Sequence, residues 1–355
     1  MRYDYLIVGQ GLVGTVLAHT LESNGLSFLI IDADHPETSS KVAAGLMSPI
    51  TGKRIVKTWK ADEVFPFAQT FYRGLEQKLG EQLYFEKRIY KPFQTIEEEN
   101  DMISRSADET FSKLLDFNID TSVYDNVLKN QRGGVDILLG GNVWSEKLLR
   151  LSRDYFISRN CLKTESFDYS ELTIQNENIE YKGVKAERVI FCEGHFAVYN
   201  PYFSWLPFSV TKGEQLYIES EEIPEDKIIS KGGYVLPTGN KQFILGASYE
   251  RTANNTISEK GREIVVKKMG EVLASNYTIV GQRSGIRPTV RDRRPFIGAH
   301  PEHNRVTIFN GMGTKGVTLS PYFATHFIKY LEKGEDLNAE VNIKRYFSLY
   351  TGFKK

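Results

Sequence analysis

The sequence predicts an α/β protein, α+β overall, in which a domain with a parallel sheet is interleaved with a second domain built on an antiparallel sheet. A strand, a glycine-rich turn, a helix and a second strand fill the first 32 residues. Residues 208–248 change to alternating strands separated by turn signals. A further strand, glycine-rich turn and helix follow near residues 305–331. Because no Pro/Gly-rich linker separates these parts, we expect the two domains to share the chain in several segments.

The N-terminal unit has the pattern of a β-α-β motif. The segment Tyr3–Val8 is short and nearly continuously apolar, which is typical of a strand buried on both faces of a parallel sheet. Thr15–Ser23 has helical periodicity and is followed by Asn24-Gly25, a good helix stop. Leu26–Ile31 reads as the second strand, and it is followed by Asp32.

The rest of the chain alternates between helical and strand patterns. Residues 35–59 are rich in small residues and are expected to form a loop. We expect helices at 64–79, 97–117, 143–160 and 317–331, and strands within 83–96 and at 189–192, 215–219, 233–236, 242–245 and 305–309. The predicted dinucleotide-binding domain comprises residues 1–60, 140–200 and 281–355, and the predicted substrate or cap domain comprises residues 61–139 and 201–280.

Composition excludes several classes of protein. The 355 residues include 45 Lys and Arg against 45 Asp and Glu, which argues against nucleic-acid binding through bulk positive charge. The two cysteines, Cys161 and Cys192, exclude a disulfide framework. No apolar run reaches the roughly 18 residues of a membrane span. We therefore expect a soluble cytoplasmic protein with no integral membrane segment.

The strongest chemical motif lies between the first strand and the first helix. Gly9, Gly11 and Gly14 match G-x-G-x-x-G, in which the glycines allow a tight turn, close approach of a pyrophosphate and close helix packing. The helix N-terminus then presents free N–H groups to the phosphates. Asp32 follows Gly14 by about 18 residues, where a carboxylate accepts hydrogen bonds from an adenosine ribose. The motif predicts a dinucleotide site and does not by itself separate FAD from NAD.

Other chemistries find little support in the sequence. The six histidines show no metal-ligand spacing, so no metal site is expected. The chain contains no Gly-x-Ser-x-Gly nucleophile elbow and no phosphate loop ending in Gly-Lys-Ser/Thr.

Four segments carry a family resemblance. They are Ser39–Leu46, Cys192-Glu193-Gly194, Gly285-Ile286-Arg287-Pro288 and Gly311–Pro321. Together with the N-terminal motif they resemble the D-amino acid oxidase superfamily of flavoproteins, especially its glycine oxidase branch, and they occur in the family's order over residues 3–331.

The resemblance implies that FAD is the cofactor and that the first domain is a Rossmann-like FAD-binding domain. It implies that Lys315 adds a cation near the pyrimidine end of the flavin, although a solvated surface lysine is an equal alternative. The residues implied to hold FAD are Gly9, Gly11, Leu12, Val13, Gly14, Asp32, Ser39, Ser40, Lys41, Ala43, Ala44, Gly45, Leu46, Gly194, Arg287, Gly311, Gly313, Thr314, Lys315, Gly316, Val317 and Thr318.

The resemblance also implies three residues that act on the substrate. Arg287 corresponds to the arginine that holds a substrate carboxylate, and a structural ion pair is its alternative. Tyr234 corresponds to a tyrosine that lends its hydroxyl to the substrate, and a plain strand aromatic is its alternative. Tyr249 is expected to project towards the same pocket.

The activity implied is oxidation of the C–N bond of a small amine or amino acid. Hydride passes to flavin N5, and the resulting imine is hydrolysed by water; the final electron acceptor stays open. A helix beginning near Val317 is expected to stabilise the reduced flavin.

Two departures from the glycine oxidase branch leave alternatives open. Thr314 and Thr238 stand where that branch carries arginines, and the run from Gly246 to Arg251 is closer to the FAD domain of the bifunctional tRNA 5-methylaminomethyl-2-thiouridine biosynthesis protein. The alternative is therefore FAD-dependent removal of a carboxymethyl group from a modified tRNA wobble uridine, with tRNA as partner. An alternative of another class is a non-catalytic dinucleotide-binding module.

Overall fold

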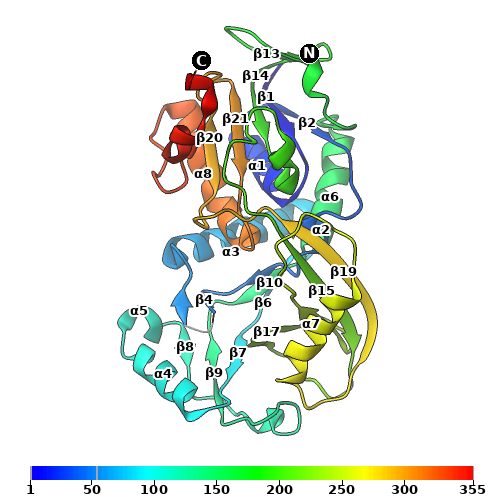
Figure 1. The fold of residues 1–355 in the computed structure, drawn as a ribbon, viewed down its shortest axis with the longest axis vertical. Coiled ribbons are helices and arrows are strands. Elements are labelled where there is room, and N and C mark those ends of the chain that lie inside the picture. The colour runs from blue at the N-terminus through cyan, green and yellow to red at the C-terminus, as the bar shows by residue number, and fades with distance from the viewer. Residues whose placement is uncertain (1, 53–54, 355) are drawn as a thin grey trace.

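A computed structural model describes residues 2–52 and 55–354 of the chain. Two eight-stranded sheets form the two halves of the molecule. Figure 1 shows both chain termini in the half that contains β1 (Arg2–Val8), while α2 (Ser39–Val42) and α3 (Ala61–Leu79) lie where the halves meet.

The first sheet has a parallel core. Its parallel pairs join β11 to β2, β2 to β1, β1 to β14, and β14 to β21. β12 and β13 extend it as an antiparallel branch on β14, and β20 pairs antiparallel with β21. The bounds are β2 (Phe28–Asp32), β11 (Leu162–Thr164), β12 (Leu172–Ile174), β13 (Ile179–Tyr181), β14 (Val184–Phe191), β20 (Phe296–Ala299) and β21 (Val306–Asn310).

Both faces of this sheet are buried, as the apolar run of β1 predicts. Tyr5 and Ile7 pack in one hydrophobic cluster with α1 (Leu12–Ser23), α6 (Ser145–Ser158) and α8 (Gly316–Lys333). Leu6 and Val8 point to the opposite face, into a second cluster. The β-α-β prediction is confirmed, and so are the predicted helices that correspond to α3, α6 and α8.

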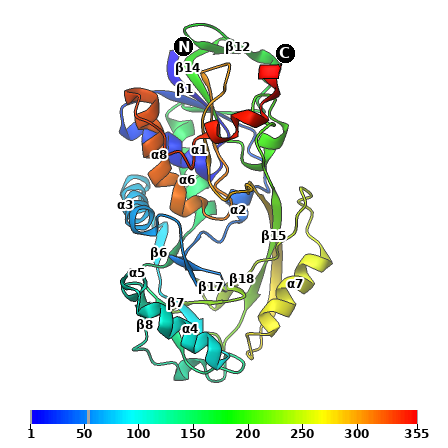
Figure 2. The same ribbon diagram turned by 60° about the vertical axis from the view of Figure 1, so that its left-hand side comes forward.

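The second sheet is antiparallel except where β16 runs parallel to β7. Its strand order is β19-β15-β18-β17-β16-β7-β9-β8. Figure 2 shows α7 (Glu259–Gly270) beside β15 and β18, and α4 (Ile96–Ser106) near β7 and β8. The bounds are β7 (Ile89–Pro92), β8 (Leu115–Asp116), β9 (Gly134–Ile137), β15 (Thr211–Glu219), β16 (Ile228–Lys231), β17 (Gly233–Gly239), β18 (Gln242–Gly246) and β19 (Thr278–Arg287).

Short elements complete the junction between the halves. β3 (Leu46–Met47), β10 (Gly141–Val143) and β6 (Tyr84–Glu86) form a three-stranded sheet, and β4 (Ile50–Thr51) pairs with β5 (Val56–Lys57). The expectation of a plain loop over residues 35–59 is therefore wrong. Thr38 starts α2 within it, because its side chain accepts a hydrogen bond from the Lys41 backbone N–H.

The single helix expected at residues 97–117 is also wrong. The structure has α4, then α5 (Glu109–Ser112), then β8. Asp108 accepts a hydrogen bond from the Thr110 N–H and so starts a new helix at the point where the first one ends. Leu115 then pairs with Ile137 in the second sheet, a long-range contact that local periodicity does not report.

Three elements of the second half, β9, α7 and β19, have no counterpart among the predicted elements. The pairing of β19 with β15 places residues 278–287 in the second sheet, so the predicted domain boundary at residue 281 falls inside a strand. No helix in the described part of the chain is long and apolar enough to cross a membrane.

Candidate functional site

Two adjoining cavities run along the junction of the halves. The Arg287 cavity, of about 310 Å³, lies between the α2–β3 segment, the end of β19 and the start of α8. The glycine-turn cavity, of about 230 Å³, lies at the carboxyl ends of β1 and β2. They share the walls formed by Leu12, Val13, Ser39, Ser40 and Pro288. Together they form one continuous elongated site past the N-terminus of α1.

The glycine turn brings α1 close to the first sheet. Gly9 has φ +99°, a conformation that favours glycine. A Cβ on Gly14 would lie 1.9 Å from the Gly9 carbonyl oxygen, so only glycine allows the helix to approach. The Leu12 N–H donates to Ser40 Oγ (3.0 Å), and α1 has no acidic residue in its first turn. The positive end of the α1 dipole is therefore available to an anion in the cavity.

The Asp32 carboxylate is held at the end of β2. Its Oδ2 accepts a hydrogen bond from the Gln10 backbone N–H (2.8 Å), and its Oδ1 accepts hydrogen bonds from Arg153 Nη1 (2.8 Å) and from the Asp34 backbone N–H (2.9 Å). The side chain lines the glycine-turn cavity, and Oδ2 keeps a lone pair that can accept a hydrogen bond from a ribose hydroxyl.

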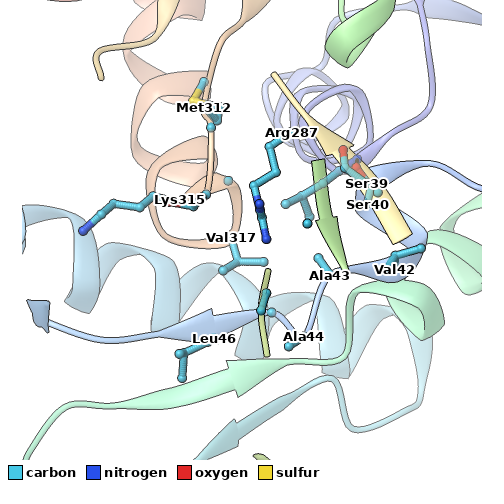
Figure 3. A pocket seen from close by; sticks show the side chains of 18 of the residues that line it. Ser39, Ser40, Val42, Ala43, Ala44, Leu46, Arg287, Met312, Lys315 and Val317 are labelled. Carbon is cyan, nitrogen blue, oxygen red and sulfur yellow. Dashed lines mark hydrogen bonds between the residues drawn. The ribbon is translucent and has the colours of Figure 1, made fainter. Parts of the chain in front are cut away.

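The predicted FAD residues gather around these cavities. Figure 3 shows Ser39, Ser40 and Ala43 to the right of Arg287, Ala44 and Leu46 below it, and Met312, Lys315 and Val317 to its left. Of the 22 predicted positions, Gly14 and Gly311 are the two that line neither cavity. Gly14 packs against Gly9, and Gly311 lines a third cavity. The lining fits a dinucleotide, whose phosphates the N–H groups at the start of α1 would hold.

Arg287 ends β19 with its guanidinium in the centre of the Arg287 cavity, as Figure 3 shows. Its Nη1 donates to the Lys212 carbonyl (3.2 Å) and more weakly to the Ser248 carbonyl (3.5 Å). No carboxylate in residues 2–52 and 55–354 forms an ion pair with it, so the structural ion pair considered as an alternative is not found there. Burial lowers the pKa of Arg287, because the charged form is less well solvated there than in water and no carboxylate compensates for the loss.

Tyr234 faces the same cavity from β17. Its hydroxyl donates to Gln215 Oε1 (2.9 Å), and burial raises the pKa of the phenol. Gln215 Nε2 in turn donates to the Val42 carbonyl. Sequence reasoning missed Gln215; the only available signal was a polar residue within the otherwise strand-like run of β15.

The structure places Tyr249 outside the expected cavity, and it places Lys315 in the wall of the Arg287 cavity. Tyr249 is 58% exposed and lines the third cavity, not the Arg287 cavity. Lys315 is half-buried, and Figure 3 shows its side chain pointing away from Arg287. Its Nζ donates to Thr58 Oγ1 (2.7 Å). Burial, with smaller contributions from Arg293 and Arg294, lowers the pKa of Lys315 to about 8.

The third cavity, which we call the basic cavity, has a volume of about 890 Å³. It adjoins the Arg287 cavity through Thr51 and the Met312–Lys315 segment, which line both. No described acidic side chain is among its lining residues. Its cationic lining residues are Lys57, Arg251, Arg291, Arg293, Arg294 and Lys315.

Within residues 2–52 and 55–354, no group of three or more His, Cys, Asp or Glu side chains is placed to hold a metal ion.

Comparison with known proteins agrees with this geometry. The family model described as DAO, FAD dependent oxidoreductase, matches residues 4–329. Glycine oxidase of Bacillus subtilis (strain 168) is 22% identical over 348 residues, which are 90% of each chain. The tRNA 5-methylaminomethyl-2-thiouridine biosynthesis bifunctional protein MnmC of Leptospira interrogans is 20% identical, over 96% of this chain and 59% of that protein.

A solved structure shows the same fold. The crystal structure of glycine oxidase from Geobacillus kaustophilus superposes with a TM-score of 0.78 at 19% identity, covering 97% of this chain and 98% of that one. The predicted α/β fold with its FAD-binding half is thereby confirmed, whereas the roles of individual site residues rest on the geometry above.

Proposed function

Because the chain belongs to the DAO family of FAD-dependent oxidoreductases, we propose that it oxidises the C–N bond of a small amine or amino acid that carries a carboxylate. The observation that carries this proposal is Arg287, a half-buried guanidinium at the Arg287 cavity without a carboxylate partner among the described residues. A partly desolvated cation of this kind is stabilised when an anionic ligand reaches it. The planar guanidinium pairs with a carboxylate through two parallel hydrogen bonds.

Tyr234 would orient the amine end of the same substrate. Gln215 Nε2 is engaged by the Val42 carbonyl, so Gln215 presents its Oε1 to the tyrosine, and the Tyr234 proton is committed to that oxygen. The phenol oxygen therefore keeps its lone pairs for an N–H group in the cavity. Arg287 and Tyr234 together would recognise a molecule with a carboxylate at one end and an amine at the other.

The Arg287 cavity supplies no evident general base. Its described lining residues include no Asp, Glu or His side chain, and Lys315 Nζ is engaged by Thr58. The substrate would therefore react with its amine in the neutral form. Bound FAD would accept the hydride that leaves the carbon, and this hydride carries both electrons of the oxidation. The Ser39–Leu46 segment and the start of α8 would hold it beside Arg287.

The test is anaerobic titration of the FAD-loaded protein with glycine, sarcosine and D-amino acids, followed by absorbance. We expect the flavin bands to bleach with at least one of them. Arg287→Ala should retain FAD and raise the substrate concentration needed for bleaching by about 100-fold, because two charge-assisted hydrogen bonds are lost. The matched control is Arg283→Ala in the same strand, since Arg283 pairs with Glu146 and lines none of the three cavities described above.

Bands that stay unbleached with every one of these free amino acids would contradict a small free amino acid as the substrate. Bands that also stay unbleached with a carboxymethylaminomethyl nucleoside and with a phosphorylated amine would favour a non-catalytic binding module. An equal loss of bleaching in both variants would contradict the role of Arg287.

A tRNA-linked carboxymethylamine is a second candidate, favoured by the cations around the basic cavity. It presents the same glycine-like carboxylate and amine. Bleaching by a carboxymethylaminomethyl nucleoside, with none by the free amino acids, would distinguish it.

A further inference from the structure

We propose that the basic cavity is a phosphate-binding subsite, and that the amine oxidised in the Arg287 cavity carries a phosphate group. This inference rests on the proposed function, and it adds the substrate class. The 45 basic and 45 acidic side chains of the molecule cancel in number, but they are not evenly distributed over it. The basic cavity gathers six cations with no described acidic side chain in its lining.

Two of the six cations form ion pairs with acids in the described ranges, and of the other four Lys315 donates to Thr58 Oγ1 instead. Lys57 pairs with Asp62 (2.7 Å) and Arg294 with Glu340 (2.9 Å). Arg251, Arg291 and Arg293 are exposed, and no carboxylate in the described ranges 2–52 and 55–354 forms an ion pair with any of them. Like charges held around one cavity repel each other, so an anion that enters relieves the repulsion.

The chemistry of the three free side chains favours phosphate. Guanidinium groups bind phosphate oxygens through paired N–H donors, and several arginines around one cavity match the two charges of a phosphate better than the single charge of a carboxylate. Tyr249 also lines this cavity and is exposed, which gives an attached organic group aromatic surface to contact.

The position of the cavity connects it to the reacting end of the substrate. Thr51 and the Met312–Lys315 segment line both this cavity and the Arg287 cavity. A ligand with its phosphate among Arg251, Arg291 and Arg293 would therefore extend its amine towards Arg287. Phosphate can come from a small phosphorylated amine or from a nucleic acid, and the side chains recognise the same group in both.

The first measurement is calorimetric binding of pyrophosphate to the FAD-loaded protein. We expect the double variant Arg251→Gln/Arg293→Gln to weaken pyrophosphate binding by about tenfold or more. The matched control Arg150→Gln removes an exposed arginine of α6 that lines none of the three cavities, and it should bind like the parent protein. Binding that is absent, unchanged in the double variant, or equally weakened in the control overturns the proposal.

A competition experiment distinguishes the two sources of phosphate. If O-phosphoserine displaces pyrophosphate at a lower concentration than either serine or a 12-residue RNA does, the ligand is a small phosphorylated amine. Displacement by the RNA at lower concentration than O-phosphoserine indicates a nucleic acid. Since calorimetry needs no turnover, loss of pyrophosphate binding in the double variant supports the subsite even if no amine bleaches the flavin.

Discussion

The space for the Arg287 guanidinium depends on a glycine in the facing strand. A Cβ at Gly213 of β15 would lie 1.7 Å from Arg287 Nη2, closer than any side-chain carbon can approach. The strand pairing places Gly213 opposite Gly285, whose own Cβ would meet Ser39 of α2 at 2.9 Å. The lack of a side chain at Gly213 thus makes room for the Arg287 guanidinium, and the lack of one at Gly285 lets α2 pack against β19.

Gly213→Ala should therefore displace Arg287 while leaving FAD bound. We expect the amine concentration for half-maximal bleaching to rise by at least about tenfold, since the two hydrogen bonds to the carboxylate need a fixed guanidinium. Gly281→Ala in β19 is the control, because the nearest atom to its added Cβ lies 3.5 Å away. Equal affinities in the two variants would show that Arg287 tolerates the added methyl group.

At the scale of elements, a buried histidine joins α1 to α6. His19 Nε2 lies 2.9 Å from Ser152 Oγ, and Lys78 Nζ lies 3.1 Å from Nδ1. Because the ammonium of Lys78 can only donate, Nδ1 accepts and the ring is neutral with its proton on Nε2. Burial, reinforced by the charge of Lys78, lowers the pKa of His19 to about 3.

This histidine should make the fold sensitive to acid. Its pKa is lower in the folded than in the unfolded chain, so the unfolded state binds the extra proton and stability falls as the pH drops below about 6.5. Between pH 7.5 and pH 5 this one group should cost about 2 kcal/mol of unfolding free energy. Urea unfolding at both pH values should show that His19→Gln removes this part of the loss. The exposed His35→Gln variant should keep it, and an unchanged pH dependence in His19→Gln would contradict the assignment.

Elements whose local pattern agrees with their final environment were predictable from sequence. β1 alternates Tyr5 and Ile7 on one face with Leu6 and Val8 on the other, and both faces are apolar because both are buried. β19 was not predictable, since its Gly- and Arg-containing sequence reflects its role at the cavity and not a buried face. α7 buries only Gly261, Val265 and Met269, too narrow an apolar stripe to stand out.

At the scale of the whole molecule, sequence motifs predicted the residues of the glycine-turn cavity better than those of the basic cavity. The glycine motif and Asp32 are close in sequence and act together locally. The basic cavity instead combines Lys57, Arg251 and the 291–294 segment, which come together only through the junction of the two sheets. Net charge carries no information about such a cluster, and neither does the spacing of its members along the chain.

The same junction predicts how FAD should act on stability. The two cavities that fit FAD are walled by α1 and β2 from the first half and by β15, β17 and β19 from the second. Binding there should stabilise both halves together, by about 2.7 kcal/mol when free FAD is 100 times its Kd. Differential scanning calorimetry of the apoprotein with increasing FAD should then show one unfolding transition that moves to higher temperature. Two transitions, of which FAD moves only one, would mean that the second sheet makes no thermodynamically significant contact with the cofactor.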